Sequence, residues 1–368
     1  MLQNLLRLTL PSLLGMLLIL ELVFTFIIPA DQFPYYYYDP DDRILRFSTA
    51  EQREGVHTIG LLAQQRAKWS INNAGWNSAV NFETSKHKPR IAIIGDSYVE
   101  AMQVNIGDSL AGQLRNLVSP HFDVYDFGIS GAPLSQYLQM ARYVRRRFDP
   151  DIVVINVVHN DFHESLCSVT RKVGMLCLED DGQDIREAPI LAYQPNSVFR
   201  LVRHSSVIRY LIGNMQIETR LKRLTASKQN NQKYNANIDV EKAKSLRESI
   251  RKAIDYIHRT IVLENNGRPV VFLMDAPRKD IYKGTTSESN VRWMNELLEE
   301  KTAQYGLPLV DLSNEFKSLF EAEKVHFESE YDFHWNENGH RVAAYALYRK
   351  LRTLQSFQQT ENAHRLLQ

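Results

Sequence analysis

The chain has 368 residues, of which 44% are hydrophobic and 24% are charged, and its formal net charge is +1. This composition is ordinary for a globular protein and excludes disordered and collagen-like classes. A nearly neutral chain gives no electrostatic reason to expect nucleic acid as a partner, because neutralising phosphates requires a concentrated basic face.

The N-terminal residues 8–28 read LTLPSLLGMLLILELVFTFII. As a helix this segment would span about 31 Å, which matches the core of a bilayer. Glu21 would cost roughly 2 to 3 kcal/mol in mid-membrane, but the surrounding Leu, Ile, Val and Phe residues outweigh that cost. We therefore predict that residues 1–29 form a cytoplasmic N-terminus and a single transmembrane anchor.

The charges that flank the anchor predict its orientation. Arg7 precedes the apolar segment and Asp31 follows it, so the bulk of the chain is expected in the periplasm or otherwise outside the cytoplasm. The alternative is a cleaved signal peptide. Its apolar region would be unusually long, and Ile28 stands where a small residue is expected before cleavage after Ala30.

The chain has two cysteines, Cys167 and Cys177, ten residues apart. Outside the cytoplasm this spacing suits a local disulfide, which would contribute roughly 3 kcal/mol in the chain-entropy model. The alternative is a pair of thiols. Without further Cys or nearby His ligands, two cysteines make a poor zinc site.

Residues 30–88 are polar and begin with a stretch rich in Tyr and Asp, so we interpret them as a membrane-proximal extension with one helix-like run near residues 51–68. Residues 89–368 then alternate short apolar runs with amphipathic stretches. Strands are expected in the runs RIAIIGDS, VYDFGIS, DIVVINVV, PVVFLMDA and LPLVDLS, and helices near residues 109–118, 133–147, 240–264, 290–305 and 338–354.

This rhythm predicts an α/β fold, a three-layer, doubly wound and mostly parallel sheet of flavodoxin-like type. Residues 162–239 interrupt it and are expected to form an insertion, with a helical stretch around residues 197–224 and a mobile polar run at residues 225–239. In such sheets, ligands bind beyond the carboxyl ends of the strands.

Three strand ends offer polar or glycine residues. Ser97 follows the first strand in IIGDS and could act as a nucleophile. Gly131 in ISGAP and Asn160 in VVHND could donate to a developing oxyanion. Each residue alone is also ordinary turn chemistry, but chain geometry brings the three ends to the same edge.

Together, GDS at residues 95–97, SG at residues 130–131, ND at residues 160–161 and a late Asp and His resemble the four blocks of the SGNH, or GDSL-like, hydrolase superfamily. The resemblance covers about residues 90–354 and implies that residues 89–368 form an SGNH-like catalytic domain. It implies that Ser97 is the nucleophile and first oxyanion donor, that Gly131 and Asn160 are further donors, and that His334 is the base, oriented by Asp332.

Two positions depart from the superfamily pattern. Val158 occupies the place of a glycine usually found two residues before the asparagine. The last block usually reads Asp-x-x-His, whereas here Asp332 stands only two residues before His334. That spacing is similar to the Asp-x-His-Trp motif of bacterial exopolysaccharide O-acetyltransferases, which carry the pair before the serine.

No metal site or cofactor is expected. His334 and His340 are six residues apart, so they would not share a helix face as an i, i+4 ligand pair does. Asn336 is instead a candidate N-cap of the last helix, and His340 a packing or polar residue within it.

The sequence therefore predicts a membrane-anchored, extracytoplasmic serine esterase that removes O-acyl groups, expected to be acetyl, from a small molecule or a glycan. An O-acyltransferase acting on a polysaccharide uses the same residues and is the first alternative. A non-catalytic glycan-binding or assembly protein is the second.

Overall fold

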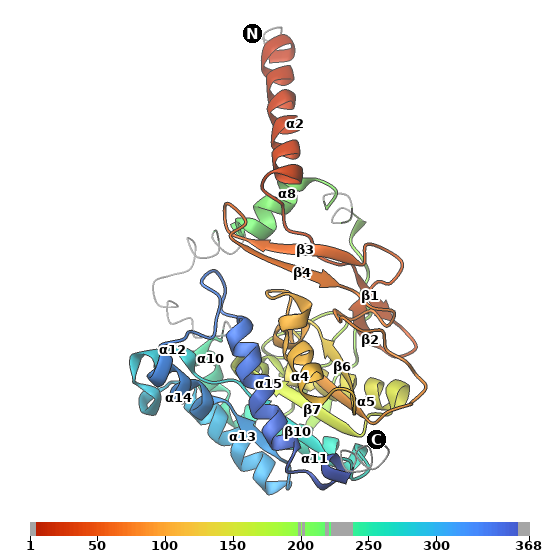
Figure 1. The fold of residues 1–368 in the computed structure, drawn as a ribbon, viewed down its shortest axis with the longest axis vertical. Coiled ribbons are helices and arrows are strands. Elements are labelled where there is room, and N and C mark those ends of the chain that lie inside the picture. The colour runs from red at the N-terminus through yellow and green to blue at the C-terminus, as the bar shows by residue number, and fades with distance from the viewer. Residues whose placement is uncertain (1–4, 198–199, 201–202, 218–220, 222–237, 360–368) are drawn as a thin grey trace.

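The computed structural model describes residues 5–197, 200, 203–217, 221 and 238–359. Its centre is a five-stranded parallel sheet (Figure 1). In spatial order the strands are β11 (Leu309–Asp311), β10 (Val270–Met274), β7 (Ile152–Val157), β5 (Arg90–Gly95) and β6 (Asp123–Gly128). Counted along the chain from β5, the order is 2-1-3-4-5, which confirms the doubly wound, flavodoxin-like prediction.

Helices cover both faces of the sheet, which is why β5, β7 and β10 are buried along their whole length. Ile94 packs into one apolar cluster and its neighbour Ile93 into the other. The first face carries α5 (Leu134–Phe148), α11 (Arg247–Glu264) and α13 (Arg292–Gln304); the second carries α4 (Leu110–Val118), α12 (Arg278–Lys283), α14 (Ser313–Glu323) and α15 (Glu337–Leu351).

The helices predicted within residues 240–359 and at residues 109–118 and 133–147 are found, but the run at residues 240–264 is divided at Leu246 into α10 (Val240–Ser245) and α11. Four further helices were not expected: α12, α14, and the short α3 (Ser97–Glu100) and α6 (His159–Glu164). Two short 3-10 helices, η2 (Ile106–Asp108) and η6 (Thr286–Glu288), complete this part of the fold.

The helix predicted near residues 51–68 is wrong, because this segment forms the antiparallel hairpin of β3 (Glu54–Ile59) and β4 (Gln65–Ser70). Two nonlocal hydrogen bonds favour the extended form: the Thr58 N–H donates to Asp31 Oδ1 at 2.9 Å, and Trp69 Nε1 donates to the Gln32 carbonyl at 2.7 Å. Gly60 turns the chain at φ +96°, a conformation open to glycine.

The extension packs against the α/β domain. It also contains β1 (Tyr36–Asp39) and β2 (Ile44–Phe47), which pair antiparallel. Phe47, Trp69, Trp76 and Phe82 are buried in the same apolar cluster as α5, so the core under one face of the sheet continues into the extension.

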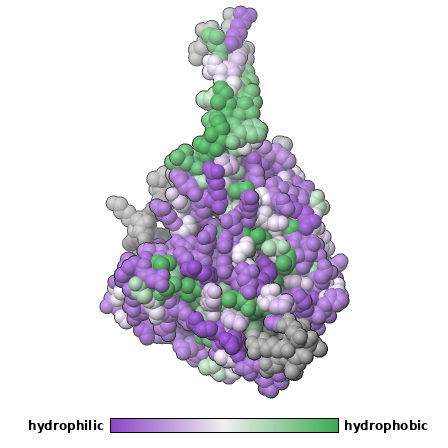
Figure 2. Space-filling model, viewed as in Figure 1, coloured by the Kyte–Doolittle hydropathy of each residue, from purple (hydrophilic) through white to green (hydrophobic). Residues whose placement is uncertain are grey.

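The N-terminal helix α2 (Leu10–Phe26), preceded by η1 (Leu5–Thr9), projects from the body as a stalk (Figure 1). None of its residues is buried, and Figure 2 shows its apolar surface. Within the described part of the chain, Arg7–Phe26 is the segment long and apolar enough to cross a membrane.

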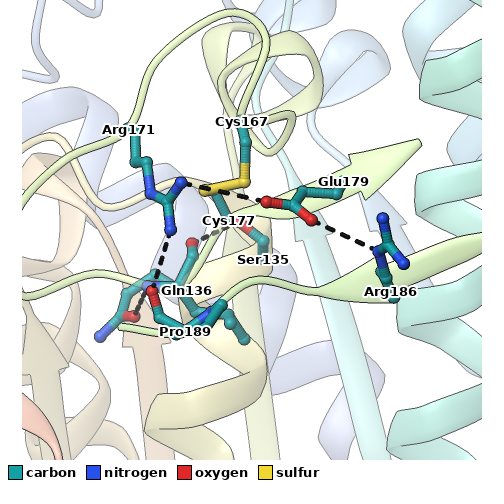
Figure 3. Close-up of a disulfide and its surroundings, with 9 residues drawn as sticks. Ser135, Gln136, Cys167, Arg171, Cys177, Glu179, Arg186 and Pro189 are labelled. Carbon is teal, nitrogen blue, oxygen red and sulfur yellow. Dashed lines mark hydrogen bonds and ion pairs between the residues drawn. A yellow bond between two sulfur atoms is a disulfide. The ribbon is translucent and has the colours of Figure 1, made fainter. Parts of the chain in front are cut away.

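The insertion contains the predicted disulfide. Cys167 and Cys177 are bonded with their Cα atoms 5.1 Å apart (Figure 3). The β8 (Leu178–Asp180) and β9 (Ile185–Glu187) hairpin follows. Of the helical stretch expected around residues 197–224, the structure contains α8 (Ser206–Arg209) and η3 (Tyr210–Asn214). Most of the polar run at residues 225–239 lies outside the described residues.

Candidate active site

Ser97 is the first residue of the short helix α3 (Ser97–Glu100), directly beyond β5. Asp96 caps this helix, because its carboxylate accepts the Tyr98 N–H at 2.9 Å. Gly95 is required at the turn, since a Cβ there would lie 2.5 Å from Val99 Cγ2. The strand-to-helix turn therefore presents the Ser97 hydroxyl at the carboxyl edge of the sheet.

Ser97, His334 and Asp332 form a continuous hydrogen-bonded chain. Ser97 Oγ lies 2.7 Å from His334 Nε2, and His334 Nδ1 lies 2.6 Å from Asp332 Oδ1. With the Nδ1 proton donated to the carboxylate, Nε2 is left as the acceptor for the serine proton. This is the arrangement of a nucleophile, a base and an orienting acid.

An Asx turn explains how an aspartate only two residues before the histidine reaches its ring. Asp332 Oδ1 accepts both the His334 backbone N–H at 3.2 Å and the His334 Nδ1–H at 2.6 Å. A carboxylate that caps the N–H two residues later is common turn chemistry. The two-residue step therefore fits a serine–histidine–aspartate site without a longer loop.

A buried polar network holds the loop that carries Asp332 and His334. Arg278 and Tyr98 both donate to the Phe333 carbonyl, at 2.8 and 3.1 Å. Asp275 pairs with Arg278 at 3.2 Å and accepts the Trp335 Nε1–H at 2.8 Å. Sequence reasoning missed Arg278 and Asp275, whose only signal was a charged pair just beyond the β10 strand.

The electrostatic surroundings favour an ionised Asp332. Burial opposes its charge, but the charge of His334 and the hydrogen bonds from the same residue outweigh burial and hold the pKa of Asp332 below its usual value. Burial instead raises the pKa of Asp96 to about 6. Asp96 Oδ2 lies 3.3 Å from Ser97 Oγ, so the serine has a second polar neighbour besides the imidazole.

Gly131 lies three residues beyond β6 and has a φ of +76°. Its neighbour Ser130 donates its N–H and its hydroxyl to the buried Glu100 carboxylate, which fixes the turn. The Gly131 carbonyl accepts the Lys172 ammonium at 2.5 Å, and Lys172 also pairs with Glu164 at 2.6 Å. Lys172 belongs to the disulfide loop and was not singled out from the sequence.

Asn160 lies in α6 (His159–Glu164), directly beyond β7, and is buried. Val158, which replaces the expected glycine, is the N-cap residue, and its N–H donates to Asp161 Oδ2 at 2.9 Å. The same oxygen accepts the Tyr137 hydroxyl at 3.0 Å. Burial and the nearby Asp96 raise the pKa of Asp161 well above its usual value. The turn is thus held without a glycine.

The strand register places the three strand-end residues at one edge. Gly95 pairs with Gly128, and Ile94 pairs with Ile155, so Ser97, Gly131 and Asn160 all follow adjacent strands at similar levels. The direct contacts of the site are those of Ser97 with His334 and of His334 with Asp332.

A cavity of about 250 Å³ lies beside this edge, next to Ser130 and Glu100. Its walls come mostly from the extension and the insertion and combine aromatic rings with polar groups; they include Phe33, Tyr35, Tyr36, His57, Tyr193 and Arg203. Such a lining suits a small organic ligand with several polar groups.

Asn336 and His340, which follow the Asp332–His334 pair, have structural roles, as predicted. Asn336 Oδ1 accepts the Gly339 N–H at 3.0 Å and caps α15. His340 is buried and its Nδ1 accepts the Leu110 N–H at 3.1 Å. Burial and the charges of His334 and Arg278 lower the pKa of His340 to about 3, so the ring is neutral.

Comparison with known proteins identifies the chain's relatives. The model of the GDSL-like lipase/acylhydrolase family matches residues 93–342. Among solved structures, a lipolytic G-D-S-L family protein from Veillonella parvula is 14% identical, with 71% of this chain and 96% of that chain covered and a TM-score of 0.39.

A lipase/acylhydrolase from Enterococcus faecalis is 12% identical; the match covers 72% of this chain and 96% of that chain, with a TM-score of 0.39. The acetyl xylan esterase AlAXEase is 13% identical, with 71% and 98% covered and a TM-score of 0.40. No curated protein matches the chain. Since the family model covers more than half of the chain, the protein belongs to the GDSL-like lipase/acylhydrolase family of ester hydrolases.

Proposed function

We propose that the protein is a membrane-anchored, extracytoplasmic serine esterase that removes O-acyl groups, chiefly acetyl groups, from a glycan. The observation that carries the proposal is the hydrogen-bonded chain from Ser97 through His334 to Asp332. Its geometry supplies an activated hydroxyl at the place where ligands bind in this fold.

In the proposed mechanism, His334 Nε2 takes the Ser97 proton as Ser97 Oγ attacks the ester carbonyl. The N–H groups of Ser97 and Gly131 and the side-chain amide of Asn160 stabilise the oxyanion. The imidazolium, stabilised by ionised Asp332, then protonates the departing sugar oxygen, and an acyl ester remains on Ser97. Water, deprotonated by His334, then attacks that ester; the bond from Ser97 Oγ to the acyl carbon breaks, the imidazolium returns the proton to Oγ, and the carboxylic acid leaves.

Two features support an anchored, extracytoplasmic location. Disulfides such as Cys167–Cys177 persist in oxidising compartments. In addition, Glu21 of the apolar helix accepts hydrogen bonds from the Ser205 hydroxyl and the Val207 N–H, at 2.9 and 3.1 Å. A cleaved signal peptide would leave these donors of the folded domain without their partner.

The residues that line the cavity next to Ser130 are the reason for proposing a glycan as the substrate. Tyr35, Tyr36 and Tyr193 are among the residues that line the cavity, and such side chains, apolar in body and polar at the hydroxyl, suit the apolar faces and polar edges of sugars. Acyl transfer remains the second candidate reaction, because replacing water by a sugar hydroxyl in the last step changes no residue of the site. The Asx turn accounts for the short Asp332–His334 spacing without favouring transfer.

The test is labelling of the full-length protein with a fluorophosphonate probe. We expect Ser97 to be modified, Ser97→Ala to abolish labelling, and His334→Ala to reduce its rate strongly. His326→Ala, an exposed histidine of the same loop, is the matched control and should label like wild type. Failure of the folded wild-type protein to label would contradict both enzymatic readings and favour a binding protein.

A further inference from the structure

The anchor is attached to the insertion at a point inside its apolar segment. Glu21 accepts hydrogen bonds from Ser205, Ser206 and Val207 at the start of α8. Thr25, one turn later, shares a 2.8 Å hydrogen bond with the Ser206 hydroxyl. The start of α8 therefore lies beside the anchor at the level of Glu21, as the position of α8 at the base of the stalk also shows (Figure 1).

This attachment sets the depth of α8. Glu21 precedes the end of α2 at Phe26 by five residues, which corresponds to about 7 to 8 Å along a helix. If the apolar helix spans the bilayer, α8 lies that far inside the end of the span. Helices that lie in the membrane interface bury their apolar face by roughly 5 to 10 Å. The depth of α8 below the end of the span falls within that range.

Tyr210 extends the attachment to the tip of the β3–β4 hairpin. Its ring stacks on Phe24 of the anchor, with centroids 3.8 Å apart and an interplanar angle of 11°. Its hydroxyl donates to the Leu61 carbonyl at 2.7 Å. The Gly60 N–H also donates to the Asn214 carbonyl at 3.1 Å. Anchor, η3 and hairpin tip are therefore joined at one level.

Asn214 fixes the chain where it leaves the anchor. Its side-chain oxygen accepts the Asp31 N–H at 2.8 Å, and its amide donates to the Pro29 carbonyl at 3.2 Å. Gly213 allows this approach, because a Cβ there would lie 2.2 Å from Asp31 Cβ. The stalk is thus coupled to the domain by specific contacts on both sides of the span's end.

The surface around this junction is apolar although it lies outside the anchor. Leu61 and Leu62 at the hairpin tip are 48% and 63% exposed, and Ile212 and Ile217 are 40% and 37% exposed. We call these four residues the membrane seat. Figure 2 shows apolar surface running from the stalk onto the adjoining edge of the body. Contiguous exposed apolar surface marks an interaction site.

Basic side chains lie near the start of α8. Arg200, Arg203, His204 and Arg209 line one cavity together with Glu51, which pairs with Arg200 at 3.1 Å, and Arg209 donates to Ser206 of α8 at 2.8 Å. Arginines next to an apolar membrane surface attract anionic headgroups.

We propose that the membrane seat is embedded in the headgroup and upper acyl region of the lipid bilayer, so that the catalytic domain is held against the membrane at two places. This inference rests on the proposed membrane anchor. The cavity next to Ser130 shares Gln32, Phe33 and Arg203 with the cavity that contains Arg209, so the seat fixes the height of the cavity next to Ser130 above the bilayer.

The test uses the full chain in vesicles of phosphatidylethanolamine and phosphatidylglycerol. Leu62→Cys and Ile212→Cys are spin-labelled under non-reducing conditions, which leave Cys167 and Cys177 bonded. Leu14→Cys reports on the anchor, and Tyr345→Cys, 48% exposed on α15, is the matched aqueous control. Collision rates are measured with oxygen, which concentrates in lipid, and with a water-soluble nickel chelate.

We expect the oxygen-to-nickel ratio at Leu62 and Ile212 to exceed that at Tyr345 several-fold and to lie between the ratios at Tyr345 and Leu14. Ratios at Leu62 and Ile212 equal to that at Tyr345, with Leu14 still in lipid, would overturn the seat. An aqueous Leu14 would overturn the anchor on which the seat depends. Fluorophosphonate labelling of Ser97 in each variant reports separately on folding and on the proposed esterase.

Discussion

The two halves of the candidate site are built in different ways. Ser97, Gly131 and Asn160 follow adjacent parallel strands, and the sheet register brings their ends to one edge. Asp332 and His334 lie in a loop between α14 and α15, which is held by Arg278, a residue of α12. Regular secondary structure positions the first half, and a buried polar network positions the second.

This difference predicts which substitutions displace each half of the site. The strand-end residues are supported by local turns, such as the Asp96 cap of α3, and by the apolar core on both faces of the sheet. The loop that carries the proposed base and its acid depends on a few long-range hydrogen bonds. A change far from Ser97 in sequence can therefore remove the base while the nucleophile keeps its place.

The largest effect is expected at the nucleophile. Ser97→Ala should lower kcat for an acetyl ester by roughly 10⁴- to 10⁶-fold, since covalent catalysis is lost and only oxyanion stabilisation and binding remain. Steady-state kinetics at substrate saturation measure it. Ser318→Ala, exposed on α14, should match wild type. Retention of full activity in Ser97→Ala would place the chemistry elsewhere.

Asp332→Asn tests the loop half directly. An asparagine oxygen can still cap the His334 N–H, but a neutral amide no longer stabilises the imidazolium, so kcat should fall by roughly 10²- to 10⁴-fold with an unchanged melting temperature. Glu330→Gln, an exposed carboxylate in the same loop, is the control. Equal kcat in the two variants would remove Asp332 from the proposed mechanism.

Arg278→Met tests the network beneath the loop. Asp275 would remain buried without its 3.2 Å ion pair, and removing one partner of a buried pair costs roughly 3 to 5 kcal/mol in the free energy of unfolding. Arg292→Met, which removes an exposed ion pair, should cost at most about 1 kcal/mol.

A second variant separates the pair from other effects of Arg278. Adding Asp275→Asn to Arg278→Met removes the unpaired charge and should recover part of the stability in denaturant titrations. No recovery would indicate that the lost hydrogen bonds to Phe333 and Tyr98, rather than the buried charge, dominate.

Asn160→Ala tests the strand-end half. Removing one oxyanion donor should lower kcat by roughly 10²- to 10³-fold with little change in KM. Asn338→Ala, half-buried near the start of α15, is the control. A fall in kcat/KM that comes from KM alone would assign Asn160 to substrate binding in the ground state instead.

Glu100 gives the smallest predicted effect, one that depends on pH. Burial raises its pKa from 4.5 to about 7, so between these values the folded state binds more protons than the unfolded state. The free energy of unfolding should therefore fall as pH rises through this window.

Glu100→Gln removes that dependence. The difference in free energy of unfolding, variant minus wild type, should rise by on the order of 3 kcal/mol from pH 4.5 to pH 8, measured by chemical denaturation. Glu54→Gln, an exposed glutamate of β3, should show a nearly constant difference across the same range. A constant difference for Glu100→Gln as well would mean that this carboxyl is not the titrating group.

Much of the fold was readable because its signals are local. The five strands are continuous apolar runs with turn residues at their ends, and the helices that cover them show apolar periodicity. The β3–β4 hairpin was misread as a helix because its extended form depends on Asp31 and Gln32, which lie more than twenty residues upstream.

The residues of the candidate site also differ in whether a local sequence signal identifies them. The GDS, SG, ND and Asp-x-His blocks identified the residues in the hydrogen-bonded chain and at the strand ends. Arg278, Asp275 and Lys172 were missed, because an isolated charged residue in sequence gives no sign of the carbonyl that it will contact in the fold.

The most direct test of the account is to trap the acyl-enzyme. Full-length protein is mixed with p-nitrophenyl acetate, quenched in acid before steady state, digested and mapped by mass spectrometry. We predict a burst of p-nitrophenol and one acetyl group on the peptide that contains Ser97, with neither in His334→Ala. Hydrolysis of the ester with Ser97 unmodified, or acetylation of a different residue, would contradict the proposed mechanism.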